Sequence, residues 1–149
     1  MQDKHTLDDW LNWQEALMEE TIVLGLDRVQ IVYDKLFPKG VPYSVITVAG
    51  TNGKGSTVSF IDSIYRQSAY KVGRSTSPHL LKYNERFAID GVDVSDEIII
   101  NAFELIEAER NEVTLTYFEF STLAALIIFA EAKVDLAILE VGLGGRLDS

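Results

Sequence analysis

The part of the chain that most constrains its fold is a short apolar run that leads directly into a glycine-rich loop. Residues 45–48 read Val-Ile-Thr-Val, which is typical of a β-strand, and residues 49–56 read Ala-Gly-Thr-Asn-Gly-Lys-Gly-Ser. Where a strand, such a loop and a helix follow one another, backbone N–H groups and the helix dipole favour a bound phosphate, and Lys54 can reach the β- and γ-phosphates. The sequence therefore predicts a triphosphate-binding loop at the end of a strand in an α/β sheet.

The spacing of this loop differs from that of the commonest P-loop. Counting back from Lys54, the first glycine of that motif falls at Val48, whereas this chain has Gly50. The residue after the lysine, usually the Ser or Thr that binds Mg²⁺, is Gly55, and a hydroxyl follows only at Ser56. The metal ligands must therefore come from another segment, or the loop works without the ion. The alternative interpretation is a glycine-rich turn that binds no ligand.

Periodicity and capping patterns predict the elements around this loop. Strands are expected over 44–49, 72–75 and 136–141, a β-hairpin over 87–94 that turns at Asp90-Gly91, an ordered loop over 76–86, and helices over 6–20, 27–36, 54–68, 96–111 and 117–132. Strands that alternate with helices predict a parallel sheet flanked by helices. Functional sites in such folds lie at the carboxyl ends of the strands.

Composition narrows the class of protein. A chain of 149 residues with 47% hydrophobic residues fits one domain with a real core. The absence of cysteine excludes disulfides and thiolate metal sites, and neither a membrane-spanning apolar run nor a signal-peptide layout is present, so we expect a cytoplasmic protein with no membrane partner. The net charge of −10 argues against a nucleic-acid partner.

The charge is unevenly distributed. Residues 50–86 contain six Lys or Arg against two acids, a local charge of +4, which leaves −14 for the rest of the chain. A positive region inside an acidic protein suits a small anion better than a polyanion. The alternative is that these are ordinary surface charges.

Two side chains outside the loop are candidate Mg²⁺ ligands. Ser77 follows the strand at 72–75, and Glu140 closes the apolar strand at 136–141, so both are expected at the same sheet edge as Lys54. One hydroxyl, one carboxylate and two phosphate oxygens would make a plausible Mg²⁺ shell. The alternatives are that Ser77 only starts a turn before Pro78 and that Glu140 forms an ion pair. Glu119 could form an ion pair or bind a ligand, and His79 is more typical of an ordinary loop histidine.

Four segments in this order carry a resemblance to a known family. The segments 49–56, 76–80 with 83–86, 116–120 and 139–148 resemble the N-terminal part of folylpolyglutamate synthase/dihydrofolate synthase, and most closely its bifunctional bacterial form. That family belongs to the Mur-ligase type of ATP-dependent amide-bond formers and acts in folate biosynthesis. The resemblance implies a Mur-ligase-like ATP-binding domain that is incomplete at its C-terminus.

The resemblance also implies a reaction and the residues that serve it. ATP phosphorylates a carboxylate of dihydropteroate or a folate, and the amine of L-glutamate then attacks the acyl phosphate. Lys54 and Glu140 would be catalytic, and Ser77 and Glu140 would bind Mg²⁺. The phosphates of ATP would be held by Thr51, Asn52, Gly53, Lys54, Gly55 and Ser56. The pterin site would be lined by Leu24, Gly25, Leu26, Thr116, Tyr117, Phe118, Glu119, Leu147 and Asp148. The resemblance gives His79 no role.

The chain departs from the family at its end. It stops at Ser149, whereas family members continue with further strands, a metal-binding histidine, a modified lysine, adenine contacts and a glutamate-ligase domain.

Two hypotheses about the function of this chain follow. One hypothesis is the N-terminal ATPase half of the ligase, with the missing C-terminal part as its partner. The other is a truncated, inactive remnant that at most binds nucleotide or pterin weakly. A third hypothesis, a Mur-type peptidoglycan ligase, is disfavoured by the segments Ser-Pro-His-Leu at 77–80 and Tyr-Phe-Glu-Phe at 117–120. We also expect poor solution behaviour, with the strand at 136–141 as an unpaired apolar edge.

Overall fold

The computed structural model describes residues 4–20, 26–50 and 52–141. Its helices are α1 (Leu7–Glu20), α2 (Asp27–Leu36), α3 (Lys54–Gln67), α4 (Asp96–Arg110) and α5 (Tyr117–Glu131), with a 3₁₀ turn η1 (Tyr83–Arg86). Its strands are β1 (Ser44–Val48), β2 (Val72–Ser75), β3 (Phe87–Ile89), β4 (Val92–Asp93) and β5 (Leu136–Glu140). Each predicted element is present, with ends that differ by at most a residue or two.

The strands form a mixed sheet in the order β1-β5-β2-β3-β4. β1, β5 and β2 are parallel, with Val48 opposite Glu140 and Ser75 opposite Leu139. β3 and β4 add the predicted antiparallel hairpin, whose turn residues Asp90 and Gly91 have positive φ values of 49° and 79°. The parallel part of the sheet is therefore limited to β1, β5 and β2.

The expectation that the strand at 136–141 would be an unpaired edge is wrong. β5 lies between β1 and β2 and pairs with both, and within the described residues it is β1 and β4 that have a strand on one side only. The burial of Leu136, Ala137 and Ile138 fits this position, because a central parallel strand is covered on both faces. The order of strands across the sheet does not follow the order along the chain.

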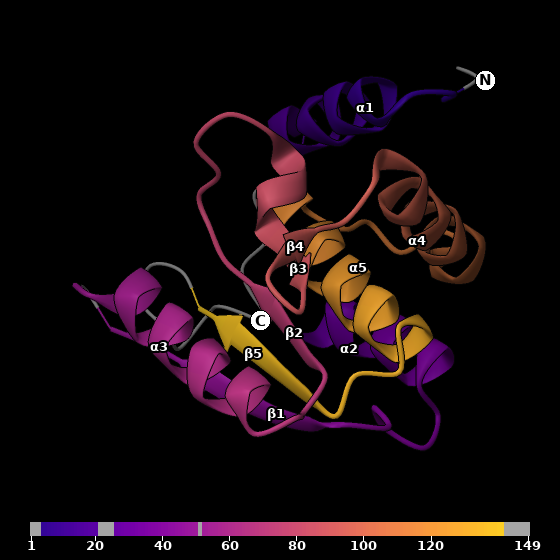
Figure 1. The fold of residues 1–149 in the computed structure, drawn as a ribbon. Helices are drawn as coiled ribbons and strands as arrows, with labels where there is room; N and C mark the ends of the chain where they lie inside the picture. The colour runs from indigo at the N-terminus through magenta and orange to yellow at the C-terminus, as the bar shows by residue number, and fades with distance from the viewer. Residues whose placement is uncertain (1–3, 21–25, 51, 142–149) are drawn as a thin grey trace.

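Helices cover the sheet from both sides (Figure 1). On one face, α3 packs through Val58 against Val72 and Ile138. On the other face, α5 runs against the sheet, and α4 and α1 pack on the outer side of α5. Phe129 and its neighbours form the larger core there. Because α5 is enclosed by the sheet and by other helices, it is apolar on nearly every side, as its sequence predicts.

The N-terminal helix is fixed by a capping box and by aromatic packing. The Thr6 N–H donates to Asp9 Oδ2 at 2.9 Å, and the Asp9 N–H donates to Thr6 Oγ1 at 3.1 Å. Trp10 is 3% exposed and packs on Phe103, so it belongs to the core. Within the described residues, no helix combines the length and the apolar character needed to cross a membrane.

Candidate functional site

The carboxyl ends of the three parallel strands meet at one edge of the sheet, as the sequence predicts. β1 leads into the glycine-rich loop, β5 ends at Glu140, and β2 leads to Ser77. A groove of about 430 Å³ lies at this edge. It is lined by Gly53, Lys54, Gly55, Ser59, Arg74, Thr76, Ser77, Pro78 and Glu140. The structure thus brings the lysine of the loop and both candidate metal ligands to one groove.

The glycine-rich loop presents the start of α3 to this groove. Gly53 precedes the helix with a φ of 73°, a left-handed conformation that glycine adopts without strain, and its carbonyl accepts the Thr57 N–H at 3.0 Å. The first turn of α3 contains no acidic residue, so no carboxylate offsets the positive end of the helix dipole there. Gly53, Lys54 and Gly55 line the groove, Asn52 and Ser56 are exposed, and Thr51 lies outside the described residues.

The Lys54 side chain crosses from α3 to the end of β5. Its Nζ donates a hydrogen bond to the Val141 carbonyl at 2.9 Å, and the Val141 N–H donates to the Val48 carbonyl at 2.9 Å. The ammonium group is therefore held beside the ends of β1 and β5, next to Glu140. This position lets a cation reach a phosphate chain that lies along the helix start.

Ser77 and Glu140, the candidate Mg²⁺ ligands, both lie at the groove. A hydroxyl and a carboxylate are the hard oxygen donors that Mg²⁺ prefers. Both residues line the groove and also a smaller cavity of about 20 Å³, which has room for roughly one water molecule. Within the described residues, no cation forms an ion pair with Glu140, and no group of three or more His, Asp or Glu side chains forms a metal site by itself. A metal bound here would need ligands from a nucleotide as well.

The loop after β2 is held in place by Glu85. Its carboxylate accepts hydrogen bonds from the backbone N–H groups of Lys82, Leu80 and Leu81 at 2.7, 2.9 and 2.9 Å. These bonds favour the charged form and lower the pKa of Glu85 below its ordinary value of 4.5. The predicted ordered loop is thus tied together by one exposed carboxylate that binds three consecutive backbone donors.

His79 packs against the base of this loop. Its Nδ1 accepts a hydrogen bond from Arg86 Nε at 2.9 Å, and its ring meets the Tyr83 ring edge-on. Arg86 also lies over the rings of Tyr83 and Tyr117 and lines the small cavity beside Ser77. His79 lines neither cavity at the sheet edge, so within the described residues it orients Arg86.

Two of the residues assigned to the pterin site form the cap of α5. Thr116 Oγ1 accepts the Glu119 N–H at 3.1 Å, and Glu119 Oε1 accepts the Thr116 N–H at 3.0 Å. Glu119 Oε1 also accepts a hydrogen bond from Arg28 Nη2 at 3.2 Å, so Glu119 and Arg28 form an ion pair. Its other oxygen, Oε2, is buried without a hydrogen-bond partner. Glu119 therefore has a structural task and one oxygen still without a donor.

Of the other residues assigned to the pterin site, Phe118 and Leu26 line two adjoining cavities, and Tyr117 lines neither of these two. Phe118 lines the small cavity, and Tyr117 packs edge-on against Tyr83. Leu26 lines an apolar cavity of about 210 Å³ between α2 and α5, together with Val29, Gln30, Tyr33, Thr122, Leu123, Leu126 and Leu139. Thr122 and Leu139 line both cavities, so the two are neighbours. Leu24, Gly25, Leu147 and Asp148 lie outside the described residues.

Sequence reasoning did not identify three side chains that the structure places at these cavities. Arg74 lines the large groove, Arg86 the small cavity, and Thr122 the small and the apolar cavity. Arg74 was detectable, because a charged residue near the carboxyl end of an apolar strand is the same signal that identified Glu140. Thr122 gave no such signal, since a threonine in an apolar helix is compatible with plain core packing.

Comparisons with known proteins agree with the resemblance in the sequence. The chain is 47% identical over 144 residues to dihydrofolate synthase/folylpolyglutamate synthase of Escherichia coli, a match that covers 96% of this chain and 34% of that protein. It is 50% identical over 144 residues to the protein of the same name in Haemophilus influenzae, with 96% of this chain and 32% of that protein covered. No protein-family model matches the chain.

Solved structures give the same result for the fold. The structure of Escherichia coli FolC in complex with DHPP and ADP superposes with a TM-score of 0.90 at 46% identity, covering 97% of this chain and 35% of that one. The Yersinia pestis bifunctional folylpolyglutamate synthase/dihydrofolate synthase complexed with AMPPNP and Mn ion superposes with a TM-score of 0.93 at 45% identity. This match covers 99% of this chain and 37% of that one. The chain spans about a third of the length of the relatives it matches. Over nearly its whole length the chain therefore matches the N-terminal part of the folylpolyglutamate synthase/dihydrofolate synthase family.

Proposed function

We propose that this chain is the Mg·ATP-binding part of a ligase that adds L-glutamate to dihydropteroate or to folates. The observation that carries the proposal is the groove at the sheet edge, which combines the start of α3, Lys54, Ser77 and Glu140. Relatives of 47% and 50% identity are named dihydrofolate synthase/folylpolyglutamate synthase, and a solved relative is complexed with AMPPNP and Mn ion. Both findings support a nucleotide with a divalent cation as the ligand of this groove.

In this proposal the nucleotide phosphates lie across the first turn of α3. The backbone N–H groups of 52–56 donate to phosphate oxygens, and Lys54 exchanges its hydrogen bond with the Val141 carbonyl for one with the β- or γ-phosphate. The exchange is short, because the ammonium group already lies at the end of β5. The left-handed Gly53 lets the chain turn close to the phosphates.

Ser77 and Glu140 are the proposed Mg²⁺ ligands of this chain. A bound Mg²⁺ supplies charge neutralisation and orientation of the phosphates. Ser77 replaces the hydroxyl that Gly55 cannot offer, and Glu140 provides the carboxylate. The hydrogen bonds of Glu85 and the pairing of β5 with two strands fix the backbone of both residues before any ligand binds.

The proposed reaction has two steps. A carboxylate oxygen of dihydropteroate or folate attacks the γ-phosphorus of ATP, which forms an acyl phosphate and releases ADP. The amine of L-glutamate then attacks the acyl carbon, which forms the amide and releases phosphate and a proton. The residues of this chain bind and orient the phosphates, and the apolar cavity at Leu26, next to the small cavity at Phe118, is the proposed place for the pterin. Most of the catalytic effect would come from positioning and charge neutralisation.

The dependence of nucleotide binding on Mg²⁺ tests this function. We expect Glu140→Gln and Ser77→Ala to weaken the binding of Mg·AMPPNP by about tenfold each, because each loses one oxygen ligand of the ion. Binding measured in EDTA should be the same for both variants and the wild type. Glu131→Gln is the matched control, because Glu131 is exposed at the far end of α5. Variants that bind Mg·AMPPNP as tightly as the wild type would contradict the metal site.

A measurement of turnover distinguishes the ligase from a remnant that only binds the nucleotide. The ligase forms ADP over repeated turnovers only when dihydropteroate or folate and L-glutamate are both present, because L-glutamate consumes the acyl phosphate of the first step. A protein that binds Mg·ATP but forms no ADP with either acceptor would favour the remnant.

A further inference from the structure

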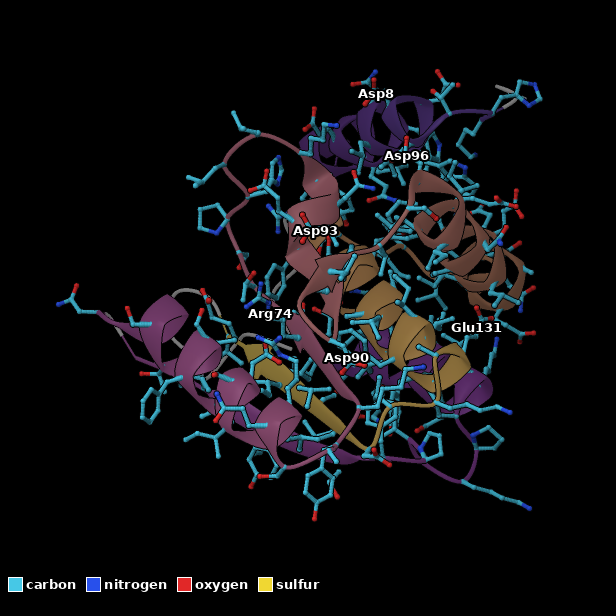
Figure 2. All side chains as sticks on the ribbon, in the orientation of Figure 1. Asp8, Arg74, Asp90, Asp93, Asp96 and Glu131 are labelled. Atoms are coloured by element: carbon cyan, nitrogen blue, oxygen red, sulfur yellow. The ribbon has the colours of Figure 1, made fainter. Side chains whose placement is uncertain are left out.

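Arg74 is a charged residue of β2 that follows the buried Val72 and Gly73, and it lies near the end of the strand next to the phosphate loop. Val72 is fully buried against Val58 of α3, and Arg74, on the same face of β2, lines the groove that Lys54 and Glu140 also line. Its side chain is 26% exposed. Figure 2 shows Arg74 in the space between β2 and α3.

Asp62 of α3 holds Arg74 in this position. The Asp62 side chain is only 1% exposed, and its Oδ2 accepts a hydrogen bond from Arg74 Nη1 at 3.3 Å. Its Oδ1 accepts a hydrogen bond from Arg66 Nε at 3.0 Å, one turn further along the same helix. Both oxygens of the buried carboxylate are therefore paired, as a buried charge requires.

The charges of this group do not balance. Two guanidinium groups face one carboxylate, so the three side chains carry a net charge of +1. Arg66 alone already supplies a counter-charge to Asp62 from its own helix. Of the two arginines, Arg74 lines the groove, and Arg66 does not. The surplus positive charge therefore lies at the wall of the groove.

We propose that Arg74 is a second phosphate-binding cation of this groove, with Asp62 as the residue that positions it. The inference rests on the proposed function, because it assigns Arg74 to the phosphate chain of the same nucleotide. A guanidinium has several N–H donors in a fixed plane, so Nη1 can stay on Asp62 while the remaining donors contact phosphate oxygens. Lys54 would then bind the phosphate chain from the side of α3 and β5, and Arg74 from the side of β2.

A binding titration with charge-matched variants tests this assignment. We expect Arg74→Met to weaken the binding of Mg·AMPPNP by about tenfold, because it removes one charge-assisted contact to phosphate. Lys71→Met is the control, since it removes the same charge just before the opposite end of β2, about 10 Å away and beyond the screening length at physiological salt. Its affinity should stay within about twofold of the wild type. Lys54→Met reports separately on the phosphate loop.

The folding of each variant is checked by its thermal midpoint. If Arg74→Met does not fold, Arg74→Lys carries the test, because it keeps a counter-charge for Asp62 but lacks the planar fork that reaches both groups. Arg74→Lys should then bind Mg·AMPPNP at least about threefold more weakly than the wild type. Wild-type affinity in the Arg74 variants, together with loss of binding in Lys54→Met, would overturn this inference alone. A wild-type protein that binds no Mg·AMPPNP would overturn it and the proposed function together.

Discussion

Individual carboxylate side chains stabilise much of the local structure around the groove. Glu85 collects three backbone N–H groups, Asp62 two guanidinium groups, and Glu119 both the cap of α5 and an ion pair with Arg28. Each of them accepts hydrogen bonds from more than one fixed donor. Glu140 differs from these three, because within the described residues no cation pairs with it and it lies beside open space. That difference is the residue-level argument for a ligand at Glu140.

The pKa of Glu85 leads to a prediction for the loop that carries Ser77. Since its pKa is lower in the folded than in the unfolded chain, the carboxylate stabilises the loop fully above pH 4.5, and this stabilisation is lost as the pH falls through the lowered value. We expect Glu85→Gln to increase the hydrogen exchange of the Leu80, Leu81 and Lys82 amides at about pH 7, because an amide oxygen is a weaker acceptor. The difference between the variant and the wild type should shrink as the pH falls below 4.5, because the wild-type carboxylate progressively loses its charge. A difference that does not change with pH would contradict this account, and Glu112→Gln is the exposed control.

The site residues differ in how far the sequence could predict them. Ser77 and Glu140 were predictable as groove residues because the carboxyl ends of parallel strands meet at one edge, and both follow or close a strand. Arg74 was noted only as one of several positive charges, because a sum of charges says nothing about which of them face the same space. The double task of Glu119 depends on Arg28, which is distant in sequence, so only the three-dimensional structure reveals it.

At the level of elements, local signals fixed the helix ends and left the strand order open. Ser95 and Thr116 each cap a helix by accepting the N–H three residues ahead, and the sequence placed the starts of α4 and α5 there. Such signals involve neighbouring residues only. The pairing of β5 with both β1 and β2 joins segments that lie far apart in the chain, which explains why the prediction of an exposed β5 edge failed.

The packing of β2 on α5 leads to a prediction for stability. A Cβ added at Gly73 would lie 2.4 Å from Cδ1 of Phe129, whose ring is fully buried. We expect Gly73→Ala to lower the free energy of unfolding by about 1–3 kcal/mol, because the ring has no room to move away. Chemical denaturation measures this change. Addition of Phe129→Leu to Gly73→Ala should recover part of the loss.

Gly55→Ala serves as the control for stability. An added Cβ at Gly55 meets no atom within 4 Å, and alanine favours the first turn of a helix over glycine. Its free energy of unfolding should be unchanged or slightly higher. A Gly73→Ala variant as stable as the wild type would show that β2 and α5 are not packed as closely as described.

At the scale of the whole molecule, the fold brings positive side chains together at one place of an acidic protein. The chain has a net charge of −10, whereas Lys54 and Arg74 line one groove at the sheet edge. β1 and β4 are the outer strands of the sheet within the described residues, and Val45 of β1 is 41% exposed. Any self-association of the chain through strand pairing would therefore involve β1 or β4 rather than β5.

The most direct test of the central claim is a calorimetric titration of the protein with Mg·ATP, beside the variant Lys54→Ala. Lys54 joins the start of α3 to the end of β5, so its removal takes the cation out of the groove while the core stays intact. The account predicts saturable binding by the wild type and its loss in Lys54→Ala, with the same thermal midpoint for both proteins. Equal binding by the two proteins, or no binding by the wild type, would contradict the assignment of this groove to the phosphates of ATP.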